Sequence, residues 1–499
     1  LTLLMPAYPS ALAALQSPRE VAALSGLPCG EGRLLQGRLP EHGFSTVLFD
    51  CEGFRQRSGN PYVDESGREY ADNAISFASL AHAAVRICAG QTALPVPHVV
   101  HANDWHAALI PALLQVAGVQ DVASVLTIHN LAFQGNYPLD LAERVGLSSD
   151  MAGPDGAEFW GQLSFLKAGI RYADRISIVS PTYAEEVLTA RFGCGMEGLL
   201  QQRRADIVPI ANGVDVQAWN PETDPLIVRR FGIDGLRNKA YCKRALLDMF
   251  GLPVMARAPL LALGSRITHQ KMADVALAAL PQLLERHTRL QVVALGRGEH
   301  EYEAGLQALA ARFPERVAVH IGYDEERAHA LHAGADMLLH GTRFEPFGLT
   351  PIYSMRYGTI PIASRVGGIN DTVVDAGNAA APKPGATGVL FDGEQAEDMI
   401  AAVERALGWY AKSGEWNALQ RAAMSGDFSW EQPARSYIAL YCSLAPQATV
   451  QVEAAASVET AAPSEHALPL EPVLARIETV RVPASEPVAG FRPVRVVAA

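Results

Sequence analysis

Residues 337–356 read MLLHGTRFEPFGLTPIYSMR, an apolar run followed by a polar turn and a second apolar pattern. The spacing predicts a strand over 337–339 and a helix over 351–356. A strand, a turn and a helix in this order form one unit of a parallel α/β sheet, because parallel strands need a crossover connection. The turn exposes backbone N–H groups at the positive end of the helix dipole, which suits an anion, and Glu345 lies directly before it. The alternative is that Glu345 serves only as a favourable charge at the start of the helix.

The same alternation extends through the chain in two series. The first has apolar runs at 1–6, 46–49, 96–101, 124–129, 175–179 and 207–210, with helical stretches at 73–85 and 105–116. The second has apolar runs at 260–263, 290–295, 317–321, 337–339 and 360–363, with helical stretches at 274–286 and 326–333. A polar, proline-bearing stretch at 220–225 separates them and is typical of a connection. Two such series predict two doubly wound α/β domains, which bind ligands at the carboxyl ends of their strands.

Length and charge limit the possible functions. The chain has 499 residues, too many for one hydrophobic core, and its net charge is −12. An acidic chain argues against a nucleic-acid partner, although a small anion needs only a local group of donors. No apolar run approaches the roughly 18 residues of a membrane-spanning helix, so we expect no membrane partner. The six cysteines form no CxxC pair, which favours reduced thiols and a cytoplasmic location.

Two cations follow the predicted strand at 260–263. Residues 264–271 read GSRITHQK and place Arg266 and Lys271 in one loop at the strand end. Fixed cations stabilise a diphosphate that gains negative charge as it leaves. Arg does so by donating several hydrogen bonds from its planar guanidinium, and Lys does so as a compact positive charge. The alternative is that both are ordinary surface cations.

Polar groups also follow three other strands. In the first series, HANDWH (101–106) and TIHNLAFQG (127–135) bring Asp104, His129 and Asn130 to strand ends. A lone histidine is more often a structural residue, but two clusters at consecutive strand ends favour a site. In the second series, SRVGGINDT (364–372) carries paired glycines whose amides can approach a ligand closely. The alternative is a plain turn before a helix capped by Asp371.

Several catalytic signatures do not occur. The sequence contains no G-x-x-x-x-G-K-[ST] loop, no G-x-S-x-G elbow, no H-E-x-x-H motif and no D-x-D pair. We therefore expect no metal and no cofactor. The charge of a leaving diphosphate would have to be met by Arg, Lys and helix termini.

Together these segments resemble the glycogen and bacterial starch synthases, glycosyltransferase family 5. The matching text runs from Leu1 to about Leu444 and includes HANDWHAALIPALL, TIHNLAFQG, FWGQLSFLKAGI, VSPTYAEEV, ANGVDVQAWNPETD, GSRITHQK and GTRFEPFGLTPIYSMRYGTIPIASRVGGINDTV. The resemblance implies a GT-B fold, two Rossmann-like domains facing across a cleft. These would be an acceptor-side domain over 1–211 and a nucleotide-sugar domain over 212–429. A helix over 430–444 would cross back to the first domain.

The resemblance also implies an activity, namely transfer of glucose to an α-1,4-glucan such as glycogen, with retention of configuration and without a metal. The implied catalytic positions are Asp104, His129, Arg266, Lys271 and Glu345. The implied substrate-binding positions are Asn130, Asn212, Tyr323, Gly348, Leu349, Thr350, Gly367 and Gly368. Arg266 and Lys271 would hold the diphosphate, and Glu345 the donor glucose hydroxyls. Tyr323 would pack near the adenine, and the paired glycines would offer amides to the donor.

The residue type at position 353 distinguishes groups among the retaining GT-B enzymes. Many of them carry a second Glu eight residues after the first, where this chain has Tyr353. In this the chain is similar to bacterial glycogen synthases and differs from sucrose- and trehalose-forming relatives. Bacterial members typically use ADP-glucose, which is therefore the expected donor.

The chain departs from the family in three places. The family begins with a strand and a lysine-threonine-glycine-glycine-leucine loop, which nothing here matches, so we expect one βα unit of about 30 residues to be lacking. Residues 445–499 match no family motif, and their Ala, Val, Pro and Glu content predicts a disordered tail with a short helix near 470–477. Met272 stands where the family usually has glycine.

Three hypotheses follow. The first is an ADP-glucose-dependent α-1,4-glucan synthase, with the possibility left open that the printed chain is an inactive fragment. The second is another retaining GT-B transferase with a small acceptor, against which Tyr353 argues. The third is a catalytically inactive glucan-binding protein, against which the complete set of Arg266, Lys271 and Glu345 argues.

Overall fold

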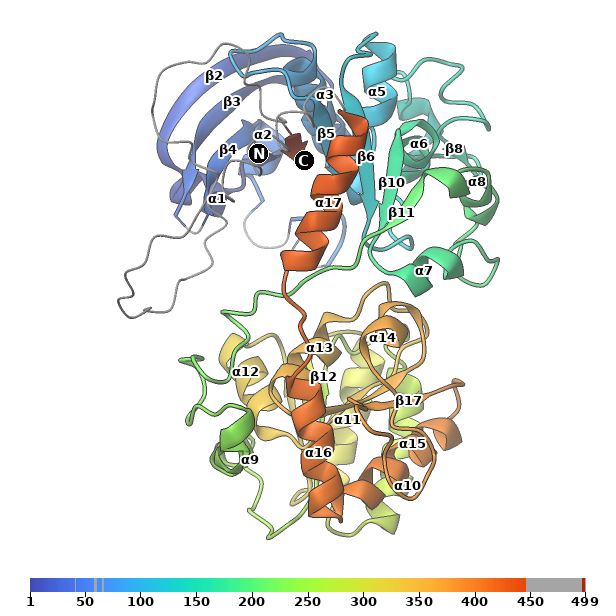
Figure 1. Cartoon of the computed structure of the whole chain (residues 1–499). Helices are drawn as coiled ribbons and strands as arrows, with labels where there is room; N and C mark the ends of the chain where they lie inside the picture. Colours follow the sequence, from blue (N-terminus) through green and yellow to red (C-terminus); the bar gives the residue numbers. More distant parts are fainter. Residues whose placement is uncertain (41, 58–60, 65–66, 446–495, 499) are drawn as a thin grey trace, which may run out of the picture. The chain divides into compact units, whose positions relative to one another are not determined.

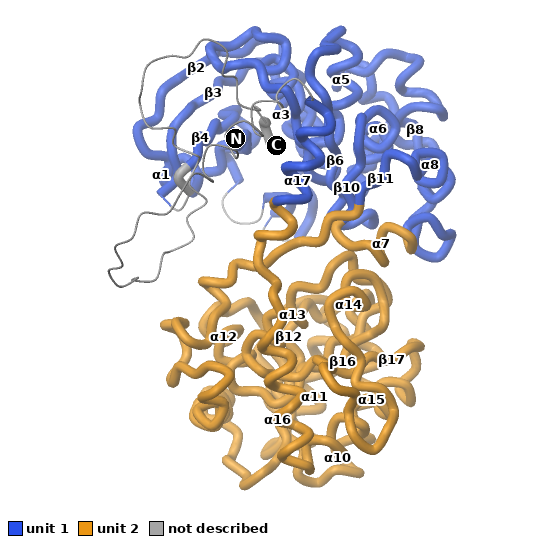
Figure 2. Tube along the Cα trace, in the orientation of Figure 1, with its two compact units in different colours: residues 1–178, 187–208, 435–499 blue, residues 179–186, 209–434 orange. Residues whose placement is uncertain are grey.

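The computed structural model describes all residues except 41, 58–60, 65–66, 446–495 and 499 (Figure 1). The chain forms two compact units, shown in different colours in Figure 2. Among the described residues, unit 1 contains 1–178, 187–208 and those from 435 onward, and unit 2 contains 179–186 and 209–434. This division differs from the predicted boundary after residue 211 mainly at the segment 179–186. That segment belongs to unit 2 because Ser180 and Thr182 donate hydrogen bonds to Asp371, at 2.6 Å each.

Unit 2 is built on a sheet of six parallel strands in the order β14-β13-β12-β15-β16-β17. The strands are β12 (Leu260–Gly264), β13 (Gln291–Gly296), β14 (Val317–Ile321), β15 (Met337–His340), β16 (Ile360–Ser364) and β17 (Val389–Phe391). Counted within the unit, this order is 3-2-1-4-5-6, that of a doubly wound Rossmann-like sheet. The predicted fold class is confirmed, and the strand order reverses between β12 and β15.

Helices flank this sheet, and its inner strands are apolar on both faces, as the parallel arrangement requires. Leu260, Leu261 and Ala262 of β12 are fully buried, and Leu261 lies opposite Met337 of β15. The helices of the unit are α7 (Pro181–Glu186), η3 (Ile233–Asn238), α9 (Lys239–Met249), α10 (Ala273–Arg286), α11 (His300–Arg312), α12 (Glu325–Gly334), α13 (Leu349–Arg356), α14 (Gly367–Thr372), α15 (Ala396–Tyr410) and α16 (Ser413–Met424).

Unit 1 is built on a nine-stranded sheet in the order β11-β10-β6-β5-β18-β1-β4-β3-β2. The strands are β1 (Thr2–Pro6), β2 (Gln16–Leu27), β3 (Gly30–Leu39), β4 (His42–Asp50), β5 (Val99–Asn103), β6 (Ala123–Ile128), β10 (Arg175–Ile178), β11 (Ile207–Pro209) and β18 (Val496–Ala498). The sequence did not predict β2 and β3, which pair antiparallel and extend the sheet beyond β4.

The helices of unit 1 are α1 (Pro9–Ala14), α2 (Glu52–Arg55), α3 (Asn73–Cys88), α4 (Asp104–Ala107), α5 (Ile110–Val116), η1 (Leu139–Leu141), α6 (Phe165–Tyr172), α8 (Glu197–Gln202) and η2 (Arg204–Asp206). The helix predicted over 105–116 is thus divided into α4 and α5. A small antiparallel sheet adds β7 (Asn136–Pro138), β8 (Glu158–Phe159) and β9 (Gln162–Ser164). Within the described part of the chain, no helix combines the length and apolarity needed to cross a membrane.

One part of the sequence-based expectation for the tail is wrong. Val496–Ala498 forms β18, which pairs in parallel with both β1 and β5, with Val497 opposite Thr2 on one side and Val100 on the other. A parallel strand between two others receives hydrogen bonds on both edges, so extended structure is favoured there over a disordered tail. The short helix predicted near 470–477 lies outside the described residues.

The predicted final helix is present as α17 (Glu431–Leu444), which passes from unit 2 into unit 1 after Ala434 (Figures 1 and 2). The Tyr441 hydroxyl lies 2.7 Å from Nδ1 of His101, whose Nε2 lies 2.6 Å from Oγ1 of Thr127. Burial, and then the nearby His129, lower the pKa of His101 to about 4, so the ring is neutral at pH 7. One ring nitrogen therefore donates and the other accepts. These bonds attach α17 to the middle of β5 and, through Thr127, to β6.

Replacing Tyr441 with Phe should loosen this attachment. The change leaves a buried ring nitrogen of His101 without its partner, which costs about 1–3 kcal/mol and lowers the melting temperature by about 2–12 °C for a unit of this size. Tyr437→Phe is the matched control, because that hydroxyl makes only long contacts of 3.4 Å to Thr127 and 3.3 Å to Ser177. Equal melting temperatures for the two variants would contradict the role given to His101.

Candidate functional site

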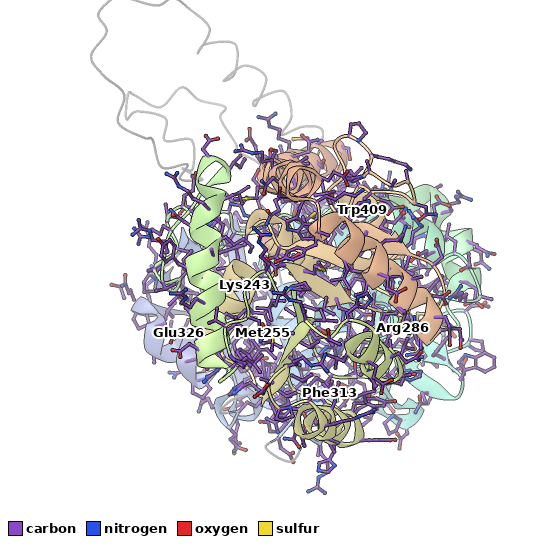
Figure 3. The ribbon with its side chains drawn as sticks, turned by 90° about the horizontal axis from the view of Figure 1, so that it is seen from below. Lys243, Met255, Arg286, Phe313, Glu326 and Trp409 are labelled. Carbon is purple, nitrogen blue, oxygen red and sulfur yellow. The ribbon has the colours of Figure 1, made fainter. Side chains whose placement is uncertain are left out.

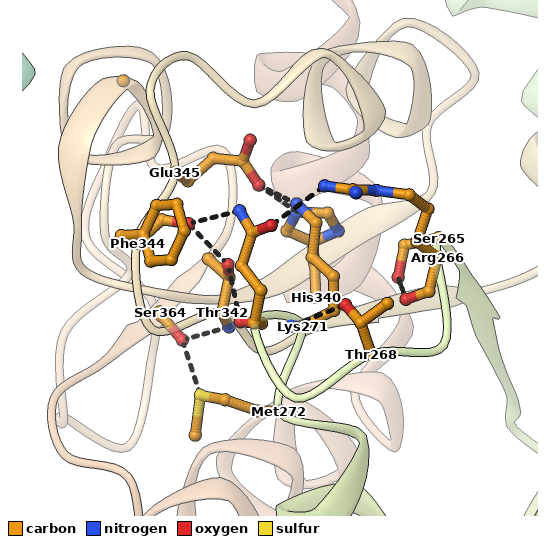
Figure 4. A network of polar contacts seen from close by, with 12 residues as sticks. Ser265, Arg266, Thr268, Lys271, Met272, His340, Thr342, Phe344, Glu345 and Ser364 are labelled. Atoms are coloured by element: carbon orange, nitrogen blue, oxygen red, sulfur yellow. Dashed lines mark hydrogen bonds and ion pairs between the residues drawn. The ribbon is translucent and has the colours of Figure 1, made fainter. Parts of the chain in front are cut away.

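A buried ion pair lies where the strand order of unit 2 reverses. Lys271, in the loop after β12, contacts Oε2 of Glu345, in the loop after β15, with 10% and 12% of the two side chains exposed (Figure 4). Nε2 of His340, the last residue of β15, lies 3.1 Å from the same carboxylate oxygen. The carboxyl ends of β12 and β15 thus bring together two of the predicted catalytic residues and a histidine that the sequence did not single out.

The charges of this cluster follow from its burial. Burial alone would raise the pKa of Glu345, but the Lys271 charge and the His340 hydrogen bond outweigh it and lower this pKa to about 2. Burial and the Lys271 charge also lower the pKa of His340, against the opposing effect of Glu345. At pH 7 the cluster therefore holds an ionised carboxylate, a cation and a neutral imidazole. Both Lys271 and His340 contact Oε2, and within the described residues Oε1 has no hydrogen-bond partner.

Arg266 lies beside this pair but is exposed. Its Nη2 donates to Oε1 of Gln270 at 2.9 Å, and Gln270 Nε2 donates to the Phe344 carbonyl at 3.2 Å. Gln270 thus links the loop after β12 to the loop after β15. His340 and Gln270 are the two members of the cluster that sequence reasoning missed. Both lie inside the quoted motifs, and a polar residue ending an apolar strand was the signal for His340.

The paired glycines are needed for close packing of the loops. A Cβ on Gly367 would lie 1.8 Å from the Glu345 carbonyl oxygen, and one on Gly368 would lie 2.4 Å from Cα of Phe347. The Gly367 amide donates to Glu186 at 2.9 Å, and the Gly368 amide donates to the Glu345 carbonyl at 3.2 Å. In this structure both amides donate hydrogen bonds to protein groups. The predicted contacts of these amides with the sugar-nucleotide substrate would therefore need these bonds to break first.

The helix that follows the paired glycines, α14, is not capped by Asp371, contrary to the alternative considered from the sequence. The residue at its start is Val366, which makes no side-chain cap, whereas Asp371 lies within the helix. The Asp371 carboxylate instead accepts hydrogen bonds from the hydroxyls of Ser180 and Thr182. Asp371 therefore fixes the segment 179–186 against α14.

The first turn of α13 carries the remaining predicted loop residues. Gly348 precedes the helix with φ +93°, a left-handed conformation that glycine adopts without strain, and its Cβ would lie 2.8 Å from Ile369. Leu349 is exposed and Thr350 is half-buried. The backbone conformation and close packing at position 348 thus explain why a glycine stands there. The substrate-binding roles of Gly348, Leu349 and Thr350 stay predictions.

Met272 occupies a position that suits glycine. It precedes α10 with φ +52° and ψ +37°, and left-handed backbone costs a non-glycine residue roughly 1–2 kcal/mol. The side chain is fully buried and lies 3.6 Å from the Ser364 hydroxyl. Burying a Met side chain contributes about 1.5–3 kcal/mol, so the burial offsets the strain.

The other predicted residues of unit 2 lie on its surface or beside an aromatic stack. Tyr323 is 82% exposed, and its hydroxyl donates to Glu325, which is the main reason its pKa rises to about 12. Tyr353 stacks on Trp219 with ring centroids 4.0 Å apart, which fixes the orientation of the Tyr353 ring. The Asn212 side-chain oxygen is buried without a hydrogen-bond partner among the described residues.

A second cluster lies at the ends of β5 and β6 in unit 1. Asp104, the first residue of α4, accepts a hydrogen bond from the His129 amide at 2.8 Å, and His129 Nε2 lies 3.1 Å from Oδ1 of Asn103. Burial raises the pKa of Asp104, and His129 opposes this rise. Asp104 also has φ +53°, a strained backbone for a residue with a side chain. Asn130 accepts from the Ala132 amide in the adjoining turn. The structure thus groups Asp104 and His129 as predicted.

These two units, with a cation–carboxylate pair at the reversal point of the second, have the architecture of a GT-B glycosyltransferase. Residues 1–202 match the starch synthase catalytic domain, and residues 254–415 match glycosyl transferases group 1. A glycogen synthase of Bordetella bronchiseptica is 54% identical over 446 residues, which are 89% of this chain and 87% of that protein. A glycogen synthase of Ralstonia nicotianae is 52% identical over 448 residues, 90% and 82% of the two chains.

A solved structure agrees with these matches. The catalytic domain of starch synthase IV from Arabidopsis thaliana, bound to ADP and acarbose, superposes with a TM-score of 0.78 at 26% identity. The match covers 88% of this chain and 91% of that one. The chain belongs to the glycogen synthase family.

The Lys271–Glu345 pair leads to a stability prediction. Lys271→Met leaves a buried carboxylate without its cation and should lower the free energy of unfolding by about 3–5 kcal/mol. The double variant Lys271→Met/Glu345→Gln removes both charges and should recover most of that loss. Urea unfolding followed by tryptophan fluorescence measures both effects. A double variant no more stable than Lys271→Met would contradict the pairing.

The pH dependence of stability should also change in Glu345→Gln. The folded-state pKa of about 2 lies below the usual 4.5, so the unfolded chain binds this proton first as the pH falls. The stabilisation is fully present above about pH 4.5 and is lost progressively toward pH 2. Melting temperatures of the two proteins, compared from pH 7 to pH 3, should therefore converge as the pH falls below 4.5. A constant difference across that range would show that Glu345 does not titrate as described.

Proposed function

We propose that this chain transfers glucose from ADP-glucose to the non-reducing end of an α-1,4-glucan, with retention of configuration, as a glycogen synthase. The observation that carries the proposal is the buried Lys271–Glu345 pair at the reversal point of a Rossmann-like sheet, in a chain 54% identical to a glycogen synthase. ADP and acarbose in the starch synthase IV structure support an adenine nucleotide as leaving group and a glucan as acceptor.

The cations act on the leaving group. As the glycosidic bond of ADP-glucose breaks, negative charge develops on the β-phosphate. Lys271 is held in place by Glu345 before the substrate binds, so it needs no reorganisation to stabilise that charge. Arg266 adds a guanidinium whose Nη2 donates to Oε1 of Gln270. We propose that these two residues neutralise the diphosphate and that no metal takes part.

Glu345 acts on the sugar. Its pKa of about 2 keeps it ionised, and its Oε1 is free within the described residues to accept hydrogen bonds from the donor glucose hydroxyls. A carboxylate accepts such bonds more strongly than a neutral group. His340 donates to Oε2 and so fixes the orientation of the carboxylate. We assign the acceptor side to the Asp104 and His129 cluster, and we place the protein in the cytoplasm.

The test is glucose transfer to glycogen from radiolabelled ADP-glucose and, separately, from UDP-glucose. The intact chain should use ADP-glucose in preference. Arg266→Gln should lower kcat/KM about 100-fold while leaving the melting temperature unchanged, because Arg266 is exposed. Arg286→Gln, an exposed arginine at the far end of α10, is the matched control and should transfer normally.

Two outcomes would overturn this function. Transfer from neither donor by the folded chain, with glycogen still bound, would favour the glucan-binding alternative. Transfer to a small acceptor but not to glycogen would favour a different retaining GT-B enzyme.

A further inference from the structure

A pocket of about 410 Å³ opens at the other end of the unit 2 sheet. It is lined by residues from η3, α9, the loop before β12 and the helices α15 and α16, as well as Asp336, which directly precedes β15. The Lys271–Glu345 pair follows β12 and β15, whereas this pocket precedes the same two strands. A five-residue strand is about 16 Å long, so the two places are separate. Figure 3 looks onto this face and labels Lys243 and Met255 of the pocket.

The pocket is strongly basic in an acidic protein. Five of its lining residues have basic side chains and one is acidic, although the whole chain has 53 acidic and 41 basic residues. The basic residues are Arg237, Lys239, Lys243, Arg244 and Arg257, and burial lowers the pKa of Lys239 to about 7. Like charges gathered around one hollow repel each other, and a cleft of one sign attracts ions of the other. Chance placement of surface cations would not favour such a grouping in this chain.

In the described part of the chain, both lysines have hydrogen-bond partners, whereas the side chains of the three arginines have none. Lys243 donates to Asp336 at 2.5 Å, and the buried Lys239 donates to backbone carbonyls such as that of Tyr357 at 2.9 Å. The three arginines of the pocket are Arg237, Arg244 and Arg257. Within the described residues, their side chains make no hydrogen bond or ion pair. All three are exposed. Their guanidinium groups present planar sets of donors, the geometry that matches phosphate oxygens.

The remaining wall is apolar and aromatic. Leu247, Val254 and Met255 line it together with Tyr410 and Trp416, whose rings meet edge to face at 5.2 Å. A volume of about 410 Å³ falls within the usual range of small-molecule sites, roughly 300–1,000 Å³. An inorganic ion would leave this wall unused, whereas the carbon skeleton of a phosphate ester would cover it.

We propose that this pocket is a second binding site of unit 2, for a small organic phosphate such as a sugar phosphate, held by Arg237, Arg244 and Arg257. The phosphate bonds to the arginines, and the organic part lies against the apolar wall. This site is independent of the donor site at the opposite ends of β12 and β15, and its existence does not rest on the proposed transferase activity.

The test uses fructose 1,6-bisphosphate and inorganic phosphate as probes, with binding to the full chain measured by titration calorimetry. The bisphosphate should bind more tightly than inorganic phosphate. The triple variant Arg237→Gln/Arg244→Gln/Arg257→Gln should weaken its binding at least about tenfold. Because these side chains are exposed and unpaired, the variant should keep the melting temperature of the unmodified chain. Arg286→Gln, which breaks only surface contacts with Glu404 and Gln282, is the matched control and should bind normally.

A second arm separates this site from the donor site. Lys271→Met/Glu345→Gln should keep its affinity for the bisphosphate. Loss of binding in that variant, or its persistence in the triple arginine variant, would overturn the proposal. No binding to the unmodified chain would overturn it as well, and equal affinity for both probes would exclude an organic ligand.

Discussion

The contact between Lys271 and Glu345 determines much of the geometry of unit 2. It joins the loop after β12 to the loop after β15, where the strand order reverses and neighbouring crossovers run in opposite directions. A buried ion pair gives less stability than well-packed apolar residues of the same size, because both charges lose water. The pair is therefore better explained by chemistry than by stability. It keeps a cation in place and a carboxylate ionised before any substrate arrives.

The surrounding loops are built to hold that pair. Arg343 binds both carboxylate oxygens of Asp274, at 3.0 and 2.8 Å, and so ties the loop after β15 to the first turn of α10. Gly367 and Gly368 then bring the loop after β16 into contact with the backbone of Glu345 and Phe347, at distances that no side chain would allow. Three loops thus converge on one carboxylate, and their contacts restrict its position to a small range. Such rigidity is what electrostatic catalysis requires.

The sequence was sufficient for features that depend on local pattern. Apolar runs located five of the six strands in the sheet of unit 2, all except β17, and polar residues in the loops after those strands located Lys271 and Glu345. Features that depend on distant contacts were not predictable in this way. His340 was missed because nothing local shows that its ring reaches Glu345 instead of the core. β2 and β3 were missed because their residues alternate too weakly between buried and exposed. β18 was missed because three small apolar residues form a strand only when β1 and β5 lie on either side.

The two cationic groups of unit 2 differ in a way that their chemistry explains. At the carboxyl ends of the strands, Lys271 is buried and paired with Glu345, so its position is fixed and its charge is partly balanced. Such a cation binds a ground-state anion weakly, and its effect grows as charge develops on the leaving group. At the amino ends, Arg237, Arg244 and Arg257 are exposed and have no carboxylate partner among the residues that the structure describes, so a stable anion gains their attraction on binding. The first arrangement favours a transition state, and the second favours a resident ligand.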